Sequence, residues 1–298
     1  KYPAMVNGPL MSQSRTSFTL ALTLAVSAVG CPGVVVEHPP VPDDDDSAGA
    51  AAMVTTFVGS PGGAGLDDGV GNDAMFYHPY GIAMLGSRMA MADGWGQTMR
   101  IFDPATAELV TVTGQPGEPG YVDSADGPPR FDYPCGMEVG PDGLLYVADR
   151  KNGRIRGVDL DTGEVVSLED QFGIVESVEP YDVTFDADGN LYFTDLSACQ
   201  LRRVNLESGI SEVLVGTPDD CRSLDGYGPA ARIGEPRGLA YHPDGRVYFT
   251  DRVGENVRML DLVTGMVSTA FGSEGNGGPG FEDGIGTEAR LHKPTGLF

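Results

Sequence analysis

The sequence is poor in histidine, cysteine, tryptophan and positive charge: 298 residues include 4 histidines, 4 cysteines, 1 tryptophan and 19 lysines and arginines. Nucleic-acid binding draws most of its affinity from cations that neutralise phosphates. With 43 acidic residues and a formal charge of −24, the chain repels polyanions, and we predict no nucleic-acid partner. The motifs GxSxG and HExxH and the phosphate-binding loop are also missing, which removes the commonest hydrolase and nucleotide-binding signals.

Helical periodicity is missing as well. Beyond residue 50 no segment repeats its apolar residues every 3.6 positions, so long helices are not expected there. Glycine (43 residues) and proline (22 residues) are abundant, which favours an all-β protein with many tight turns. The apolar fraction of 41% is enough to build a core.

Residues 1–31 have the layout of a secretory signal, with Met11 as the expected start. A polar stretch with one cation, Arg15, precedes an apolar run that is too short to span a bilayer. The end of this run, AVGC (28–31), resembles a bacterial lipobox, which would make Cys31 the lipidated first residue of the mature protein. Ordinary signal cleavage, or an incidental thiol at Cys31, are the alternatives.

Residues 32–52 are rich in proline and small residues and include four consecutive aspartates. Such a segment cannot bury a core, and its charges repel one another, so it predicts a disordered, extended tether. Together with Cys31, the tether predicts an exported protein, either a cell-envelope lipoprotein or a secreted one. Contact with a membrane is expected only through the lipid anchor.

From residue 53 onward the chain repeats itself. Four segments carry an aspartate followed seven residues later by an arginine, and a proline precedes each segment. The pairs are Asp93/Arg100, Asp149/Arg156, Asp195/Arg202 and Asp251/Arg258. Spacing that is constant within a unit and variable between units predicts a packed supersecondary element joined by surface loops.

Each unit reads as four short strands. The first follows the proline, as in GLAYH (238–242), and turns such as Pro243-Asp244-Gly245 lead to the second, as in VYFTD (247–251). Asp-Gly and Thr-Gly supply the positive φ angles that tight hairpins need. Four-stranded antiparallel units repeated in this way predict that residues 53–298 form a β-propeller.

The stretch PRGLAYHPDGRVYFTD (236–251), with the arginine that follows it at Arg258, resembles the NHL repeat. The loops DGYGPAAR (225–232) and DGIGTEAR (283–290) resemble those of exported bacterial NHL proteins. The third unit departs from the pattern, because it lacks this loop and has Asp182 where the other units have glycine. We therefore expect its inner edge to differ locally.

The order of the strands predicts an incomplete propeller. We expect an outer strand over VTTFVG (54–59) and an inner strand over TGLF (295–298), without the two middle strands that would join them into one blade. On this interpretation four full repeats and partial ones belong to a propeller of five or six blades, truncated at its C-terminal end.

Because the aspartate–arginine pair recurs in every unit, we interpret it as structural, since a catalytic site needs one asymmetric cluster. The Asp-Gly loops invite a calcium site, but DGYGPAAR (225–232) offers a single carboxylate, whereas calcium loops space several oxygen ligands. We therefore predict no cofactor, with calcium as the remaining alternative.

The resemblance to bacterial NHL proteins also implies a disulfide between Cys199 and Cys221, which an oxidising compartment would allow. Cys135 would then be a buried free thiol.

Of the four histidines, His38 lies in the tether, while His78 and His292 precede prolines and His242 follows an inner strand. A histidine metal centre of the amidating-lyase type would need such side chains to converge on the axis. We predict no metal site and no catalytic residue. A hydrolase or lyase similar to gluconolactonases or amidating lyases, with a central divalent cation, stays as the alternative.

Loop aromatic and arginine residues are the remaining candidates for a function, because such side chains commonly anchor binding faces. The interpretation that we favour is a scaffold that binds a protein, a peptide or a glycan at the cell envelope. Packing between blades is the competing explanation for these aromatic residues. The candidate binding residues are Tyr77, Tyr80, Trp95, Tyr133, Tyr181, Tyr227, Arg130, Arg232, Arg237 and Arg290.

Overall fold

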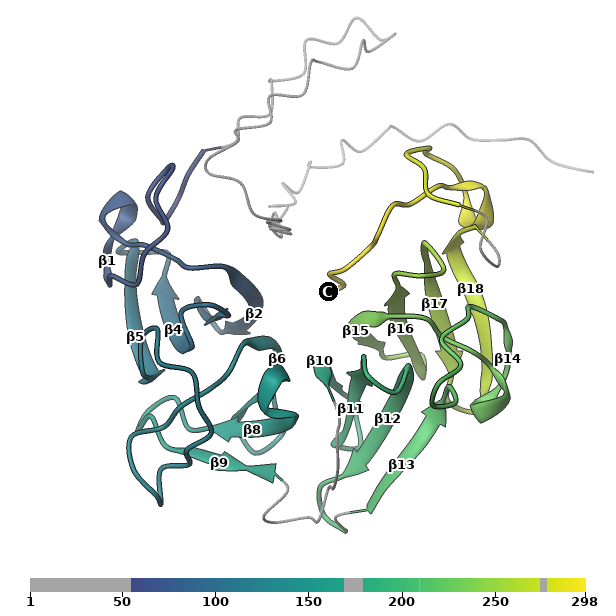
Figure 1. Ribbon diagram of the computed structural model, residues 1–298, viewed down its shortest axis with the longest axis horizontal. Coiled ribbons are helices and arrows are strands. Elements are labelled where there is room, and N and C mark those ends of the chain that lie inside the picture. The colour runs from purple at the N-terminus through teal and green to yellow at the C-terminus, as the bar shows by residue number, and fades with distance from the viewer. Residues whose placement is uncertain (1–54, 169–178, 209, 274–277) are drawn as a thin grey trace, which may run out of the picture.

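The computed structural model describes residues 55–168, 179–208, 210–273 and 278–298. In this part of the chain four antiparallel sheets are arranged around a common axis as the blades of a propeller (Figure 1), so the predicted fold class is confirmed. The predictions of a signal sequence, a lipidated Cys31 and a tether lie outside the described residues.

Each blade begins at its proline and runs outward from the axis through four strands. Blade 1 comprises β2 (Pro79–Leu85), β3 (Arg88–Asp93), β4 (Thr98–Asp103) and β5 (Glu108–Gly114). Blade 2 comprises β6 (Pro134–Val139), β7 (Leu145–Asp149), β8 (Arg154–Val158) and β9 (Val165–Ser167). Blade 3 comprises β10 (Pro180–Phe185), β11 (Asn190–Asp195), β12 (Gln200–Asn205) and β13 (Ile210–Val215). Blade 4 comprises β15 (Pro236–His242), β16 (Arg246–Asp251), β17 (Asn256–Asp261) and β18 (Met266–Gly272).

Two blades gain a fifth strand from the loop that precedes them. β1 (Gly69–Val70) pairs with β5, and β14 (Gly226–Tyr227) pairs with β18. Both short strands come from the Asp-Gly loops, and a single 3-10 turn follows each. The short 3-10 turns of the described residues are η1 (Gly71–Asp73), η2 (Arg150–Asn152), η3 (Gly228–Ala230) and η4 (Gly286–Glu288). The Asp-Gly loops therefore extend the outer edge of a blade rather than only reversing the chain.

The hydrophobic core lies between neighbouring blades. Val147 of β7, Phe193 of β11 and Phe249 of β16 are fully buried at equivalent positions of the second strand. The proline of the first strand pairs with the aspartate of the second, as Pro134 with Asp149 and Pro236 with Asp251, and the register shifts just after the proline. Apolar residues at every second position of a strand therefore pack against the neighbouring blade, as expected when the side chains of a strand alternate between its two faces.

The inner strands pack so closely that glycine is required at their crossings. A Cβ atom at Gly81 of β2 would lie 2.3 Å from the carbonyl oxygen of Cys135 in the next blade. At Gly136 of β6 a Cβ atom would lie 1.9 Å from Oδ1 of Asp182. The predicted local difference in the third unit is therefore observed: the Asp182 side chain occupies the space that Gly136 leaves open.

The recurring arginine lies between two carboxylates in three blades. Arg156 is fully buried and pairs with Asp149 at 2.7 Å and with Asp123 at 2.5 Å. Arg258 pairs in the same way with Asp251 at 3.3 Å and Asp225 at 2.7 Å. The second aspartate belongs to the loop ahead of the blade, so the arginine ties that loop to the second strand. We refer to this arrangement as the Asp–Arg–Asp clamp; in blade 1 its members are Asp68, Arg100 and Asp93.

Blade 3 is held differently. Among the described residues Arg202 has one carboxylate partner, Asp195 at 3.6 Å, and its side chain is 20% exposed. In this blade the turn after β11 is instead joined covalently to the loop leading into blade 4, through the disulfide Cys199–Cys221. The predicted disulfide is confirmed, and Cys135 is a buried free thiol within the described residues.

Two expected strands are not formed. Residues 55–59 are irregular, and in residues 295–298 the Thr295 carbonyl accepts hydrogen bonds from the Gly238 amide at 2.7 Å and the Thr250 hydroxyl at 3.3 Å without forming a strand. A strand needs a continuous ladder of hydrogen bonds with a neighbour, and the described residues provide none at either place. Within the described ranges, no helix is long and apolar enough to cross a membrane.

Candidate functional site

One face of the propeller gathers the residues just before each proline and just after each repeated aspartate. Antiparallel pairing places Pro79 opposite Asp93 and Pro180 opposite Asp195, so the start of each inner strand lies beside the end of the second strand. Side chains at these two positions from successive blades therefore meet around the axis. These positions vary from blade to blade, while the prolines and aspartates do not.

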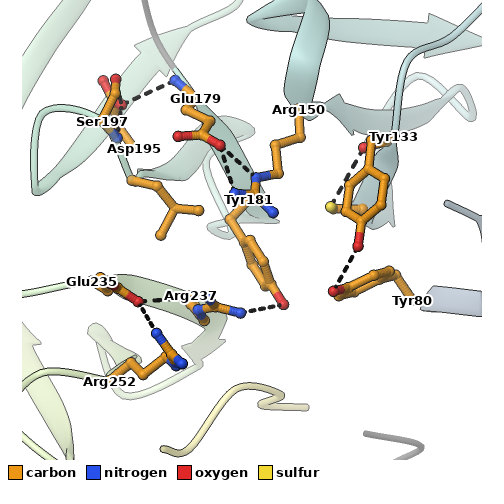
Figure 2. A network of polar contacts seen from close by, with 12 residues as sticks. Tyr80, Tyr133, Arg150, Glu179, Tyr181, Asp195, Ser197, Glu235, Arg237 and Arg252 are labelled. Carbon is orange, nitrogen blue, oxygen red and sulfur yellow. Dashed lines mark hydrogen bonds and ion pairs between the residues drawn. The ribbon is translucent and has the colours of Figure 1, made fainter. Parts of the chain in front are cut away.

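Aromatic rings form a continuous series on this face, which we call the aromatic arc: Tyr77, His78, Tyr80, Trp95, Tyr133 and Tyr181. Trp95 and Tyr133 meet edge to face at 5.1 Å between ring centroids, and Tyr133 meets Tyr80 at 5.3 Å. The hydroxyl of Tyr133 donates to that of Tyr80 at 3.0 Å (Figure 2). Edge-to-face contacts of this kind fix the rings relative to one another.

The aromatic arc is buried at its inner end and open at its outer end. Tyr133 and Tyr181 are each 6% exposed, whereas Trp95 is 41% and Tyr77 is 46% exposed. Burial raises the pKa values of the Tyr133 and Tyr181 hydroxyls, so both phenols stay neutral. The inner rings therefore support the outer ones, which expose aromatic surface to solvent.

Cations pack against the rings. Arg237 lies 4.9 Å from the Tyr181 centroid and donates to the Tyr181 hydroxyl at 3.3 Å. Arg150 lies 5.6 Å and 5.7 Å from the centroids of Tyr133 and Tyr181. Lys151 Nζ lies 4.6 Å from the Trp95 ring centroid. Ring faces attract such charges at a gain of about 0.5–2 kcal/mol each.

Beside the aromatic arc, between blades 2 and 3, lies a hollow of about 430 Å³ that we call the basic hollow. Its lining comprises Arg150, Lys151, Asn152, Gly153, Arg154, Glu179 and Ser197. Gly153 has a φ of 66°, which lets the chain turn sharply after η2, where Lys151 is exposed and Asn152 is half-buried. Lys151 belongs to both features, since it contacts Trp95 on one side and lines the hollow on the other.

The acids at this mouth are paired with arginines. Glu179 accepts two hydrogen bonds from Arg150, at 2.8 Å and 2.6 Å, and Glu235 is bound by Arg252 and Arg237 (Figure 2). Burial acts to raise the pKa of Glu235, but the arginine contacts outweigh it and hold that pKa below its usual value. Both carboxylates are therefore directed at arginines of the protein itself.

The structure brings together six of the ten sequence-predicted binding residues. Tyr77, Tyr80, Trp95, Tyr133 and Tyr181 belong to the aromatic arc, and Arg237 lies against its inner end.

The other four lie elsewhere. Arg130 pairs with Glu118, Arg232 pairs with Asp220 and Arg290 contacts Ser273, each within the loop that carries it, and Tyr227 lies on β14 at the outer edge of blade 4. No contact joins the four arginines Arg130, Arg232, Arg237 and Arg290 into one cationic island.

The histidines do not converge. His78 belongs to the aromatic arc, His242 contacts Asp244 at 2.9 Å, and His292 lies 3.7 Å from Glu255. Within the described ranges no group of three or more histidine, cysteine, aspartate or glutamate side chains is placed to hold a metal ion.

Two acids on the inner strands have no arginine partner among the described residues. Asp182 accepts hydrogen bonds from the amides of Val183 and Leu239, both at 2.9 Å, and Glu138 accepts one from the Phe185 amide at 3.2 Å. Burial raises the pKa of Asp182 to about 8, and the neighbouring Glu138 adds to the shift. Burial also raises the pKa of Glu138.

Asp182 should make the stability of the fold depend on pH. Its folded pKa lies above its unfolded value of 3.8, so the folded state holds an extra proton between these values. The stabilisation is complete below the unfolded pKa and is lost as the pH rises through about 8. In thermal unfolding, Asp182→Asn should flatten the fall in Tm across this range. The control variant Asp188→Asn, in an exposed turn, should show the same fall in Tm with pH as the unaltered protein. If the Asp182→Asn variant also shows that fall, Asp182 is not its cause.

Comparisons with known proteins agree with the repeats and the fold. The chain is 34% identical over 101 residues to NHL repeat-containing protein 2 of Bos taurus, covering 33% of this chain and 14% of that protein. It is 29% identical over 137 residues to a gluconolactonase of Zymomonas mobilis, covering 43% of this chain and 36% of the enzyme. The match thus spans only part of each relative. No protein-family model matches the chain.

Among solved structures, an auxiliary nutrient binding protein from Bacteroides thetaiotaomicron superposes with a TM-score of 0.51. The superposition covers 81% of this chain and 70% of that protein, at 20% sequence identity. At this identity the likeness concerns the fold.

Proposed function

We propose that this chain, a β-propeller built from repeats of the NHL type, is an exported protein that binds a glycan or a peptide on the aromatic arc. The observation that carries the proposal is the arc itself. Trp95 and Tyr77 expose aromatic surface, and the rings of three successive blades fix them from behind. Rigid aromatic anchors lose little conformational freedom on binding, and they dominate the energetics of many binding faces.

The paired carboxylates support binding over catalysis at this mouth. General acid–base catalysis needs a group whose proton is free to move at the working pH. Glu179 and Glu235 are instead engaged in ion pairs with Arg150, Arg252 and Arg237, and the pKa of Glu235 is held below its usual value. Their charge serves to position the arginines beside the rings.

Export is supported by two independent features. The disulfide Cys199–Cys221 is of a kind that persists in oxidising compartments. Residues 11–31 have the layout of a secretory signal, and a lipid anchor at Cys31 is part of the proposal. The auxiliary nutrient binding protein that shares the fold is in keeping with a binding role at the cell envelope.

Binding can be followed by tryptophan fluorescence, because Trp95 is the only tryptophan in the sequence. Ligands found on oligosaccharide and peptide arrays would be titrated into the protein while tryptophan emission is recorded. We expect the emission to change with saturation. Tyr77→Ala should weaken binding by about tenfold, the usual effect of losing an aromatic anchor.

The matched control is Tyr227→Ala, which removes a tyrosine even more exposed than Tyr77 from the outer edge of blade 4. It should leave the affinity unchanged. A ligand that binds by calorimetry without altering Trp95 emission, and with equal affinity for both variants, would place the binding site away from the aromatic arc.

A second candidate function rests on Asp182 and Glu138, the inner-strand acids without arginine partners. Unpaired acids near the axis favour a hydrolase or lyase of the gluconolactonase or amidating-lyase type. The described residues do not fit the divalent cation of such enzymes, since they contain no group of three potential ligands. Stoichiometric calcium or zinc in the purified protein would decide for this alternative.

A further inference from the structure

The cations at the mouth define the chemistry of the ligand, and this inference rests on the proposed function. Lys151 is exposed, and within the described residues its ammonium lies over two rings, 4.6 Å from the Trp95 centroid and 5.2 Å from the Tyr133 centroid. No carboxylate of the described residues forms an ion pair with it. In a chain with 43 acids, a lysine held in place without an acidic partner is available to an anion from outside.

The surroundings of Lys151 add to its charge. Arg150 lines the basic hollow with it, and the one acid among the lining residues, Glu179, is already paired with Arg150. Glu179 accepts through a single oxygen, Oε1, from two nitrogens of Arg150. Farther along the arc, Arg237 and Arg252 share one acid, Glu235. The mouth is thus locally cationic on a protein that is strongly acidic elsewhere, and a local field of this kind selects anions.

Lys151 also fixes the geometry of a ligand. It lies over Trp95 and at the edge of the basic hollow, so an anionic group bound to its ammonium would lie within reach of the exposed indole. A ligand that uses both features needs an acidic group attached to a ring with an apolar face. Asn152, whose amide donates to Gly120 and Asp149, together with the hydroxyls of the arc, adds polar groups around this position.

We propose that the aromatic arc and the basic hollow together bind an acidic oligosaccharide, with a uronate carboxylate on Lys151 and the sugar ring against Trp95. A sugar ring carries C–H faces that pack on an indole and hydroxyls that bond to amides and phenols. Its carboxylate forms the charge-assisted hydrogen bond that Lys151 lacks among the described residues. A neutral oligosaccharide would use the ring surface but not the lysine.

The test compares trigalacturonate with maltotriose, a neutral trisaccharide, by Trp95 emission and by calorimetry on the full chain. We expect trigalacturonate to bind about tenfold more tightly or better, and its affinity to fall in 0.5 M NaCl because salt screens exposed charges. Lys151→Gln should remove about tenfold of the affinity for trigalacturonate and leave binding of maltotriose unchanged. Arg88→Gln, which removes an exposed cation at the start of β3, is the matched control and should change neither.

The outcomes separate the two levels of the proposal. Equal affinity for the two sugars, or a Lys151→Gln variant that binds trigalacturonate normally, overturns the acidic oligosaccharide and leaves the aromatic arc as the site. Binding of tetraglutamate in place of both sugars, with a change in Trp95 emission, overturns the saccharide class. Absence of any emission change with the array ligands and these three probes overturns the proposed function as well.

Discussion

Replacement of Arg156 by methionine should lower the free energy of unfolding by about 3–5 kcal/mol, the usual result of removing one partner from a buried ion pair. Arg156 is fully buried and binds Asp149 and Asp123, and its guanidinium also donates to the carbonyls of Arg130 and Val122. Methionine keeps the apolar stem but leaves Asp149, itself 0% exposed, without its cation. Chemical denaturation at pH 7 measures the loss.

The matched variant is Arg202→Met in blade 3, where the same repeat position has one carboxylate partner among the described residues and is 20% exposed. Solvent screens such a pair, so we expect a loss of about 1 kcal/mol. Burial already raises the pKa of Asp149 to about 6 in the presence of Arg156. Protonation of Asp149 should therefore relieve part of the defect in Arg156→Met at low pH. Equal losses in both variants would contradict the role assigned to the second aspartate.

Removal of the disulfide by Cys199→Ser together with Cys221→Ser should cost about 3 kcal/mol. In the loop-entropy model a bond that closes this span restricts the unfolded chain by about that amount. The sequence separation is 22 residues. We expect the double variant to unfold at lower denaturant concentration and to be insensitive to a reducing agent, whereas the unaltered chain should lose stability when reduced.

The control for this prediction is Cys135→Ala, which removes the buried free thiol and leaves the bridge. This variant should still lose stability on reduction by the same amount as the parent. The prediction is wrong if the reducing agent has no effect on the Cys135→Ala variant but still destabilises the double variant that lacks Cys199 and Cys221. In that case the disulfide would contribute nothing to stability.

The blades were predictable because their constraints are local in sequence. Asp251 and Arg258 stand seven residues apart, and Asp244-Gly245 sets the hairpin between the first two strands, where Gly245 has a φ of 88°. Both signals recur with constant spacing, so strand bounds followed from a single unit. The strands expected at 54–59 and 295–298 failed because a strand also needs a neighbour, which spacing within a unit does not provide.

The site was only partly predictable. The arc residues Tyr80, Trp95 and Tyr133 were recognised as loop aromatics, but Arg150 and Lys151 were overlooked because they directly follow the structural Asp149. The usable signal was variation: the residue after the repeated aspartate is Gly94, Arg150, Leu196 or Arg252.

The second aspartate of each clamp was missed for the opposite reason. Asp225 stands in the loop DGYGPAAR (225–232), which was considered as a calcium site, although Asp68 and Asp225 each precede their arginine by about the same distance along the chain. This constant separation cannot be interpreted from the sequence alone, because the sequence does not show that the loop lies along the outer strand.

That placement of the Asp-Gly loops changes where one module ends and the next begins. A boundary drawn at Pro236 would separate Asp225 and β14 from Arg258 and β18, the partners that they bind. A boundary drawn ahead of Asp225 keeps all of them in one piece of chain. The unit that can be duplicated, shuffled or grafted without loss of its own contacts therefore starts at the aspartate of the loop, well before the first strand that it supports.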